Sequence, residues 1–228
     1  MRRADIIKVY SQLQKTELSK LNIQNIIIIP PILHDELYHR VDASKKMLIR
    51  EKLLLSQSRH LFLFVGALSV RKGYDILVDA IKRFNANPAF AIKADFILVG
   101  PQVHGCEQLS FENVQYIGYS DNVSEYMQAC DTFVLPTRSE GFGRVYIEAL
   151  ACGLLPLTTH LTGVNDYLGE ITDFVDLNPS AYKNAFCEQI CQSAESDTDA
   201  NLDTYHKVLH GYRKEVIVDK LKNYYEVK

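Results

Sequence analysis

Short runs of apolar, mostly branched residues recur along this sequence, and longer segments with helical periodicity lie between them. Most of these runs are continuously apolar, which is typical of strands covered on both faces, as in a parallel sheet. The predicted strands are 6–10, 26–30, 61–66, 95–100, 114–118, 132–136, 154–159 and 172–177. The predicted helices are 12–21, 43–56, 75–85, 122–129, 144–152 and 180–193. The alternation predicts an α/β fold, a doubly wound, mostly parallel, Rossmann-like sheet with right-handed crossovers.

In such a sheet, ligands bind beyond the carboxyl ends of the strands. Glycine or proline ends several of the predicted strands: "VG" at 65–66 and at 99–100, "IG" at 117–118 and "LPT" at 135–137. Glycine lets the backbone turn sharply and approach a ligand closely. We therefore expect a binding site at this edge of the sheet, with Gly66 and Gly118 among its residues.

Charge and hydropathy exclude some classes of function. The net charge of −3 gives no reason to expect nucleic-acid binding. No apolar run approaches the ~20 residues that span a bilayer, and "MRRADIIKVYSQLQ" lacks the apolar stretch of a signal peptide. We expect a cytoplasmic protein.

The five cysteines contain no C-x-x-C pair, so we expect buried thiols instead of disulfides or a zinc knuckle. Cys187 and Cys191 lie four apart on a predicted helix, where packing is the expected role.

The histidines predict no metal site. His206 and His210 are spaced i, i+4, but no H-E-x-x-H and no third ligand accompanies them. His104 and His160 follow predicted strands, so they are candidates to line the cleft or are bystanders there.

One candidate anion site lies in "GALSVRKGYDILVDA" at 66–80. Arg71 and Lys72 stand in a turn between a strand and a helix that begins near Asp75. Cations beside a helix N-terminus suit a phosphate. The alternative is a pair of solvated loop charges. The order G-x-x-x-x-G-K-[ST] is absent, so this is not a P-loop.

The second candidate is "SEGFGRVYIEALACG", in which seven residues separate Glu140 from Glu148. On one helix the two would lie about 12 Å apart along the axis and about 80° apart around it, too far to reach the same atom. With Glu140 in a turn and Glu148 in the following helix, they could instead contact two parts of an extended ligand. Ionised carboxylates accept from neighbouring sugar hydroxyls, and the amides of "GFGRV" form a helix N-terminus suited to an anion.

Both glutamates also have ordinary explanations. Glu148 could form a simple surface pair with Arg144 at i−4. Glu140 could be a turn acid near the helix dipole. The spacing alone does not choose between these readings and a functional pair.

Four segments together resemble the C-terminal domain of family-4 glycosyltransferases, retaining enzymes of the GT-B fold that use nucleoside-diphosphate sugars. They are "LFLFVGALSVRKGYDILVDAI", "DFILVG", "NVQYIGYSDNVSEYMQACDTFVLPTRSEGFGRVYIEALACGLLPLTT" and "TGVNDYL". The resemblance covers roughly residues 5–228. Glu-x7-Glu after a K-G segment is its most specific element.

The resemblance implies roles for particular residues. Lys72 matches the lysine that holds the donor diphosphate, and Glu140 matches the acid near the donor hexose. These two are the implied catalytic residues. Glu148 matches the acid that accepts from the ribose hydroxyls. The residues implied to line the rest of the donor site are Gly66, Ala67, Arg71, Ile117, Gly118, Tyr119, Gly141, Phe142, Gly143, Arg144 and Val145. Neither a metal nor a cofactor is implied, because protein cations and helix ends neutralise the diphosphate.

The sequence departs from the family at two points. Ala67 stands where members commonly carry arginine, and Arg71 is a candidate to supply that charge from the turn. The resemblance also implies an N-terminal Rossmann-like domain that binds the acceptor, and we expect this sequence to carry only the end of it. Residues 1–24 resemble its end, 25–204 the nucleotide-sugar-binding domain, and 205–228 a terminal helical segment.

The resemblance implies a donor-binding half that transfers sugar to a glycan or lipid-linked acceptor, together with an N-terminal domain or partner subunit. A lipid-linked acceptor would place the protein peripherally at the inner face of a membrane. The alternatives are a non-catalytic nucleotide- or sugar-binding module in regulation or assembly, and a GT-B sugar-nucleotide epimerase, which the Glu-x7-Glu context favours less.

Overall fold

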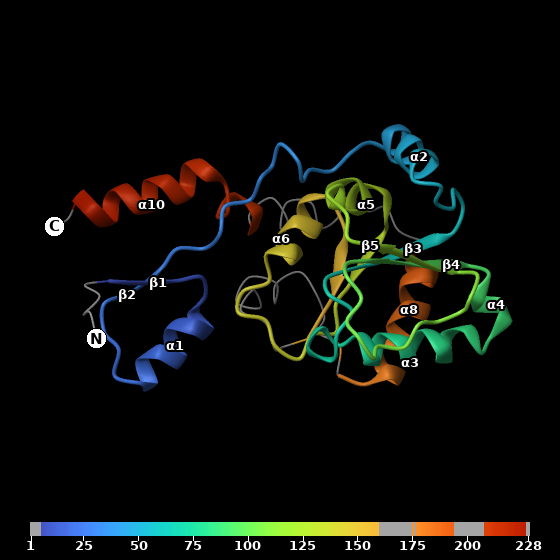
Figure 1. Cartoon of the computed structure of the whole chain (residues 1–228). Helices are drawn as coiled ribbons and strands as arrows, with labels where there is room; N and C mark the ends of the chain where they lie inside the picture. Colours follow the sequence, from blue (N-terminus) through green and yellow to red (C-terminus); the bar gives the residue numbers. More distant parts are fainter. Residues whose placement is uncertain (1–5, 160–174, 176, 194–207, 227–228) are drawn as a thin grey trace.

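The computed structural model describes residues 6–159, 175, 177–193 and 208–226. Its main element is a five-stranded parallel sheet with the order β5-β4-β3-β6-β7 (Figure 1). The strands are β3 (His60–Val65), β4 (Ala94–Val99), β5 (Val114–Gly118), β6 (Thr132–Val134) and β7 (Leu155–Leu157). The doubly wound α/β fold expected from the sequence is therefore confirmed.

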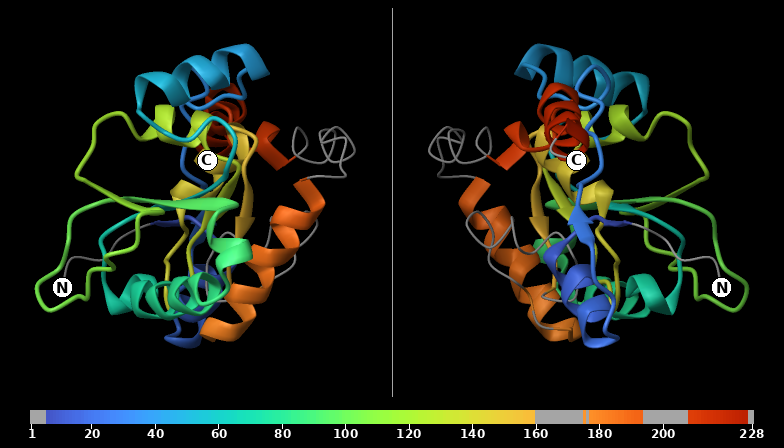
Figure 2. Two further views of the ribbon diagram at one scale, coloured as in Figure 1. Left: turned by 90° about the vertical axis from the view of Figure 1, so that its right-hand side faces the viewer. Right: turned by 90° about the vertical axis from the view of Figure 1, so that its left-hand side faces the viewer.

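Helices cover both faces of this sheet (Figure 2). One layer contains α3 (Tyr74–Asn85), α4 (Pro88–Ala91) and α8 (Pro179–Ser193). The other contains α2 (Ala43–Lys52), α5 (Val123–Ala129) and α6 (Arg144–Ala151). The sheet is thus buried on both sides, which explains the continuously apolar strands.

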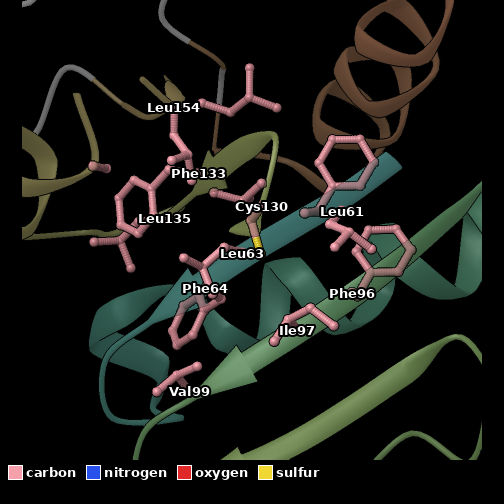
Figure 3. Close-up of a cluster of buried hydrophobic side chains, with 14 of the residues drawn as sticks. Leu61, Leu63, Phe64, Phe96, Ile97, Val99, Cys130, Phe133, Leu135 and Leu154 are labelled. Carbon is pink, nitrogen blue, oxygen red and sulfur yellow. The ribbon is translucent and has the colours of Figure 1, made fainter. Parts of the chain in front are cut away.

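The core lies between the central strands and the helices. Every residue of β4 is buried, and side chains of β3, β4 and β6, such as Leu63, Ile97 and Phe133, lie together in Figure 3. On the α3–α8 side the Phe96 ring lies 5.3 Å from that of Phe62 and 5.2 Å from that of Phe186, between ring centroids. Such aromatic contacts add to the free energy of burial and fix α8 against the sheet.

The strand order defines where a ligand can enter. The chain winds outward from β3 through β4 to β5, then returns to β6 beside β3 and winds the other way to β7. The winding direction therefore changes between β3 and β6. In open α/β sheets, the crevice beyond the carboxyl ends of the strands at such a switch point is the usual ligand site.

A smaller unit stands beside the main sheet. The strands β1 (Ile7–Val9) and β2 (Ile26–Ile28) pair in parallel, and α1 (Gln12–Lys20) connects them. The terminal helix α10 (Lys214–Glu226) lies toward the same end of the molecule (Figure 1). Because β2 pairs with β1, the small unit extends past the predicted boundary at residue 24. The division into 1–24, 25–204 and 205–228 stays a prediction.

The element boundaries differ from the predictions in a few places. The short helices η1 (Val70–Lys72) and α4 were not predicted. The strand predicted at 172–177 lies largely outside the described residues. All five cysteines are free thiols; Cys130 and Cys152 are buried, whereas Cys191 is exposed, so its predicted packing role is wrong.

Candidate functional site

The first part of the site is the turn that follows β3. After Gly66 the chain forms η1, and the Ser69 hydroxyl accepts from the Lys72 amide at 3.4 Å. Gly73 then turns the chain into α3 with a φ of 72°. A Cβ at Gly73 would lie 1.7 Å from the Pro136 carbonyl oxygen, so only glycine allows this approach of the two loops. The Lys72 side chain folds back over Gly66, where an added Cβ would lie 3.7 Å from its Cε.

The second part is the loop that follows β6, and hydrogen bonds join it to the first. The Arg138 amide donates to the Arg71 carbonyl at 3.0 Å. The Thr137 hydroxyl donates to the same carbonyl at 3.2 Å. The two loops leave neighbouring strands on either side of the switch point. They therefore form one connected surface at the carboxyl edge of the sheet.

Lys72 and Glu140 meet on this surface. The Lys72 ammonium hydrogen-bonds to the Glu140 carboxylate, and the two side chains are only 13% and 19% exposed. Arg71 is 60% exposed; its guanidinium lies 3.8 Å from the same carboxylate oxygen and donates to the Ser139 carbonyl at 3.2 Å. The structure thus brings together three of the residues singled out in the sequence. Two cations and one acid share a partly shielded position, where electrostatic interactions are stronger than in water.

The loop ends at the N-terminus of α6. Gly143 precedes the helix with a φ of 90°, and an added Cβ would lie 2.6 Å from the ring of Tyr146. Tyr146 is fully buried and fixes this turn, because its hydroxyl donates to the Leu135 carbonyl at 3.2 Å and accepts from Thr158 at 2.7 Å. Amides at the start of a helix attract anions. This helix start directly follows Glu140, Gly141 and Phe142.

Glu148 lies one turn further along α6. Its carboxylate does pair with the Arg144 guanidinium, at 3.3 Å, as the surface-pair interpretation expects. However, its side chain is only 13% exposed. Burial raises the pKa of the Glu148 carboxyl, and the nearby Arg144 and His34 only partly offset this. Burial disfavours the ionised form of this carboxyl, and groups with a perturbed pKa of this kind are candidates for binding sites.

The predicted residues at the ends of β3 and β5 lie along the same edge of the sheet. The Gly66 amide donates to Val99 at 2.9 Å, and the Gly100 amide donates to Gly118 at 2.7 Å. This bonding aligns the ends of β3, β4 and β5. Tyr119 is 77% exposed, and its hydroxyl donates to Asp121 at 2.9 Å. The structure therefore places Ile117, Gly118 and Tyr119 at the predicted edge, beside the end of β4.

A cleft of about 590 Å³ opens beside Glu140. One wall is the segment from Glu140 to Arg144, and the facing wall comes from the small unit, the segment 30–34 that follows it, and α10. The lining residues that sequence reasoning missed are Lys8, Tyr10, Gln14, Pro30, Pro31, Ile32, His34, Ile217 and Leu221. The two walls touch where Tyr10 meets Phe142 edge-on, with ring centroids 6.4 Å apart. No local pattern marks these residues, because the chain fold alone brings them to the site.

The predicted histidines do not gather at the site. His104 and His210 are exposed, and His160 and His206 lie outside the described residues. Among the residues that the structure describes, no group of three or more His, Cys, Asp or Glu side chains could hold a metal ion. No helix in this part of the chain has the length and apolar character needed to cross a membrane.

Known glycosyltransferases are similar to this chain in sequence and in fold. An uncharacterised glycosyltransferase of Methanocaldococcus jannaschii is 34% identical over 126 residues, covering 54% of this chain and 34% of that protein. The N-acetylgalactosamine-N,N'-diacetylbacillosaminyl-diphospho-undecaprenol 4-alpha-N-acetylgalactosaminyltransferase of Campylobacter jejuni is 26% identical over 164 residues, covering 67% and 43%. The crystal structure of Anabaena HepE in complex with UDP-glucose has a similar fold. Its TM-score is 0.81 at 18% identity, over 100% of this chain and 65% of that one.

The fold places Arg71, Lys72 and Glu140 together at the switch point of a Rossmann-like α/β domain. Residues 59–195, more than half of the chain, match the family of glycosyl transferases group 1. The chain belongs to this family, which confirms the resemblance stated from the sequence. It spans less than two thirds of the length of each relative named above.

Proposed function

We propose that this chain is the donor-binding half of a glycosyltransferase that moves a sugar from a nucleoside-diphosphate sugar to a glycan or lipid-linked acceptor. The observation that carries the proposal is the meeting of Lys72, Arg71 and Glu140 beside the N-terminus of α6. Cations and free helix amides favour a diphosphate, whereas a carboxylate favours sugar hydroxyls. An electrically mixed crevice of this kind fits a ligand that has both parts.

Each group has a role in this proposal. Lys72, Arg71 and the amides from Gly141 to Val145 neutralise the diphosphate, so no metal or cofactor is needed. Glu140 accepts from the hexose hydroxyls and Glu148 from the ribose. The nucleotide base packs against the segment from Ile117 to Tyr119. Gly66 and Ala67 form the part of the site next to the Lys72 side chain. The UDP-glucose complex of the similarly folded HepE supports this choice of donor.

The reaction then follows from electrostatics. The bond between the anomeric carbon and the diphosphate oxygen breaks, and Lys72, Arg71 and the helix start stabilise the charge on the departing diphosphate. The acceptor oxygen forms the new bond to the anomeric carbon on the same face of the sugar, and its proton passes to the departing diphosphate, so the anomeric configuration is retained.

A complete enzyme needs a second wall opposite the donor. Transfer requires exclusion of water and precise placement of both substrates. The facing wall of the described cleft consists of the small β1–α1–β2 unit, the segment 30–34 and α10. We propose that an N-terminal domain or a partner subunit completes it and binds the acceptor. The Campylobacter relative, whose name includes a diphospho-undecaprenol-linked sugar, supports a lipid-linked acceptor. We propose that such an acceptor would place the chain peripherally at the inner face of a membrane.

Calorimetric titration with uridine, guanosine and adenosine diphosphates tests the donor site. Weak binding of at least one is expected, and Lys72→Ala and Glu148→Ala should weaken it. Lys82→Ala is the control, since Lys82 on α3 forms a pair with Glu107 in which both side chains are exposed. Failure of all three nucleotides to bind would overturn the proposal. Sugar transfer by this chain alone would contradict the need for a second wall.

A further inference from the structure

The Arg138 guanidinium donates three hydrogen bonds although its side chain is partly exposed. Its two terminal nitrogens donate to the two carboxylate oxygens of Asp75, each at 2.7 Å. One of these nitrogens also donates to the Val70 carbonyl at 2.6 Å. The parallel bidentate arrangement is the strongest geometry for an arginine–carboxylate pair. The hydrogen bond from Arg138 holds the pKa of Asp75 below its usual value.

These bonds connect the two loops that carry the site. Asp75 lies three residues after Lys72, in the first turn of α3, and Arg138 lies two residues before Glu140. Between them, the Arg138 amide donates to the Arg71 carbonyl, and Gly73 packs against Pro136. The side-chain bonds and these backbone contacts together form a closed ring of contacts between the two loops. Within this ring the positions of Lys72 and Glu140 depend on each other.

We infer that Arg138 is a positioning residue for the donor site: its clamp on Asp75 and Val70 holds the Lys72 turn in register with the Glu140 loop. This inference rests on the proposed function. Placement matters because preorganised charges act on a bound ligand without the cost of reorganising when it binds.

The stability of the fold offers a poorer explanation of the clamp. Its side chains are 37% and 46% exposed, and exposed pairs contribute little to the free energy of unfolding. The same α3 helix carries a pair of similar exposure, Lys82–Glu107 at 41% and 55%, which joins α3 to the segment between β4 and β5 and not to the Glu140 loop. This pair provides a control of matched chemistry. A merely structural role predicts similar effects from breaking either pair.

Direct donor binding by Arg138 is the alternative to positioning. Its two terminal nitrogens both bond to Asp75 in this structure. A double variant, Asp75→Arg with Arg138→Asp, separates the two roles. It restores a cross-loop pair but removes the cation from position 138. Recovery of donor affinity in the double variant supports positioning, because a direct contact would remain lost.

The test compares Arg138→Ala, the double variant, Lys82→Ala and the unaltered chain. The ligand is whichever of uridine, guanosine or adenosine diphosphate binds the unaltered chain most tightly. We expect Arg138→Ala to raise its Kd about tenfold, with a thermal unfolding midpoint within about 2 °C of that of Lys82→Ala. The double variant should recover most of the affinity. An unchanged Kd in Arg138→Ala would overturn the inference, whereas absence of binding to the unaltered chain would overturn the proposed function.

Hydrogen exchange gives a second reading that requires no ligand. In Arg138→Ala, amides of residues 69–75 and of 136–141 should both exchange faster, since the clamp joins the two segments. In Lys82→Ala neither segment should change. Faster exchange in only one of the two loops of Arg138→Ala would contradict a coupled ring.

Discussion

The side chains of Lys72 and Glu140 meet although 68 positions separate them in the chain. Each follows one of the two neighbouring strands at which the winding of the sheet reverses, β3 for Lys72 and β6 for Glu140. The topology therefore creates the contact, and the two loops arrive at one crevice because their strands are parallel. This pairing links the fold to the chemistry proposed for the site.

Replacing Lys72 by methionine tests the charge separately from the bulk. The methionine keeps the chain that lies over Gly66 but leaves Glu140 without its ammonium partner. Charged hydrogen bonds contribute about 1.5–3 kcal/mol, so nucleoside-diphosphate affinity should fall roughly 10- to 100-fold in calorimetric titration. Lys20→Met, which breaks an exposed pair with Glu17 on α1, should leave affinity unchanged. Equal affinities for both variants would exclude Lys72 from the binding site.

Glu148→Gln should stabilise the fold while weakening nucleotide binding. Burial raises the pKa of Glu148 in the folded state above its unfolded value, so the folded protein holds this proton more tightly. The charge on Glu148 therefore lowers stability as the pH rises through the folded pKa, and the cost is largest above that pKa. Glutamine removes it. A higher thermal midpoint at pH 7 with a higher Kd is expected, and a lower midpoint would favour the simple pair with Arg144.

The pH dependence of binding offers an independent check on the same residue. Only the ionised carboxylate is a pure acceptor for two ribose hydroxyls. Nucleotide affinity should therefore decline on acidification around a pKa above the ordinary 4.5 of glutamate. Glu148→Gln should bind weakly at every pH and lose this acidic decline. A decline that persists in the variant would assign the titration to another group.

Positions 71 and 67 can be tested as alternative places for one positive charge at the donor site. Arg71 is largely exposed, so Arg71→Ala should weaken diphosphate binding by a few-fold at low salt and less in 0.5 M salt, where its charge is screened. Ala67→Arg in that background should restore affinity, since position 67 directly follows Gly66 at the end of β3. Calorimetry at two salt concentrations decides this. Affinity that does not respond to either substitution would remove Arg71 from the site.

Much of the fold could be predicted from the sequence because its signals are local. The predicted strand at 114–118 coincides with β5, and α6 and α8 lie within one residue of their predicted bounds. Strand ends were less predictable: β6 stops at Val134, just before Leu135 and Pro136, and proline has no amide to continue the ladder.

The site was only partly predictable, because only some of its residues stand in local sequence motifs. Lys72, Glu140 and Glu148 stand in motifs with distinctive spacing, so the sequence could nominate them. Arg138 has no such signal, because its partner Asp75 is 63 positions away and a lone arginine in a loop is usually solvated. Cleft residues such as Tyr10 come from a separate unit. Their approach depends on long-range packing.

The close contact at Gly73 predicts a large effect from a single methyl group. In Gly73→Ala the Cβ would lie 1.7 Å from the Pro136 oxygen, so one of the two loops must move. Gly105 provides a matched control, with a φ of 83° but no atom within 4 Å of an added Cβ. Gly105→Ala should cost about 1 kcal/mol of unfolding free energy from backbone strain alone. Gly73→Ala should cost at least about 2 kcal/mol more and lose nucleotide binding, as measured by urea unfolding and calorimetry. Similar costs for both would contradict the close approach.

Asp131 predicts the opposite pattern, a loss of stability without a loss of binding. It precedes β6 at the end of the sheet away from the site, where its carboxylate accepts from Arg50 at 2.8 and 2.7 Å and from the Leu61 amide at 2.8 Å. Arg50 is itself buried. Because removal of the carboxylate leaves that cation uncompensated, Asp131→Asn should cost about 3 kcal/mol of unfolding free energy.

The same carboxylate determines how Asp131→Asn should respond to pH. Burial alone would raise the pKa of Asp131, but Lys46 and Arg50 outweigh it and hold the pKa below the ordinary 3.8. The stabilisation is therefore present above that value and is lost as pH falls toward the folded pKa. Urea unfolding between pH 7 and pH 2 should show the difference between Asp131→Asn and the unaltered chain shrinking below about pH 4. Nucleotide affinity at pH 7 and 25 °C should stay within about twofold. A constant difference across this range, or a large change in affinity, would contradict a role confined to folding.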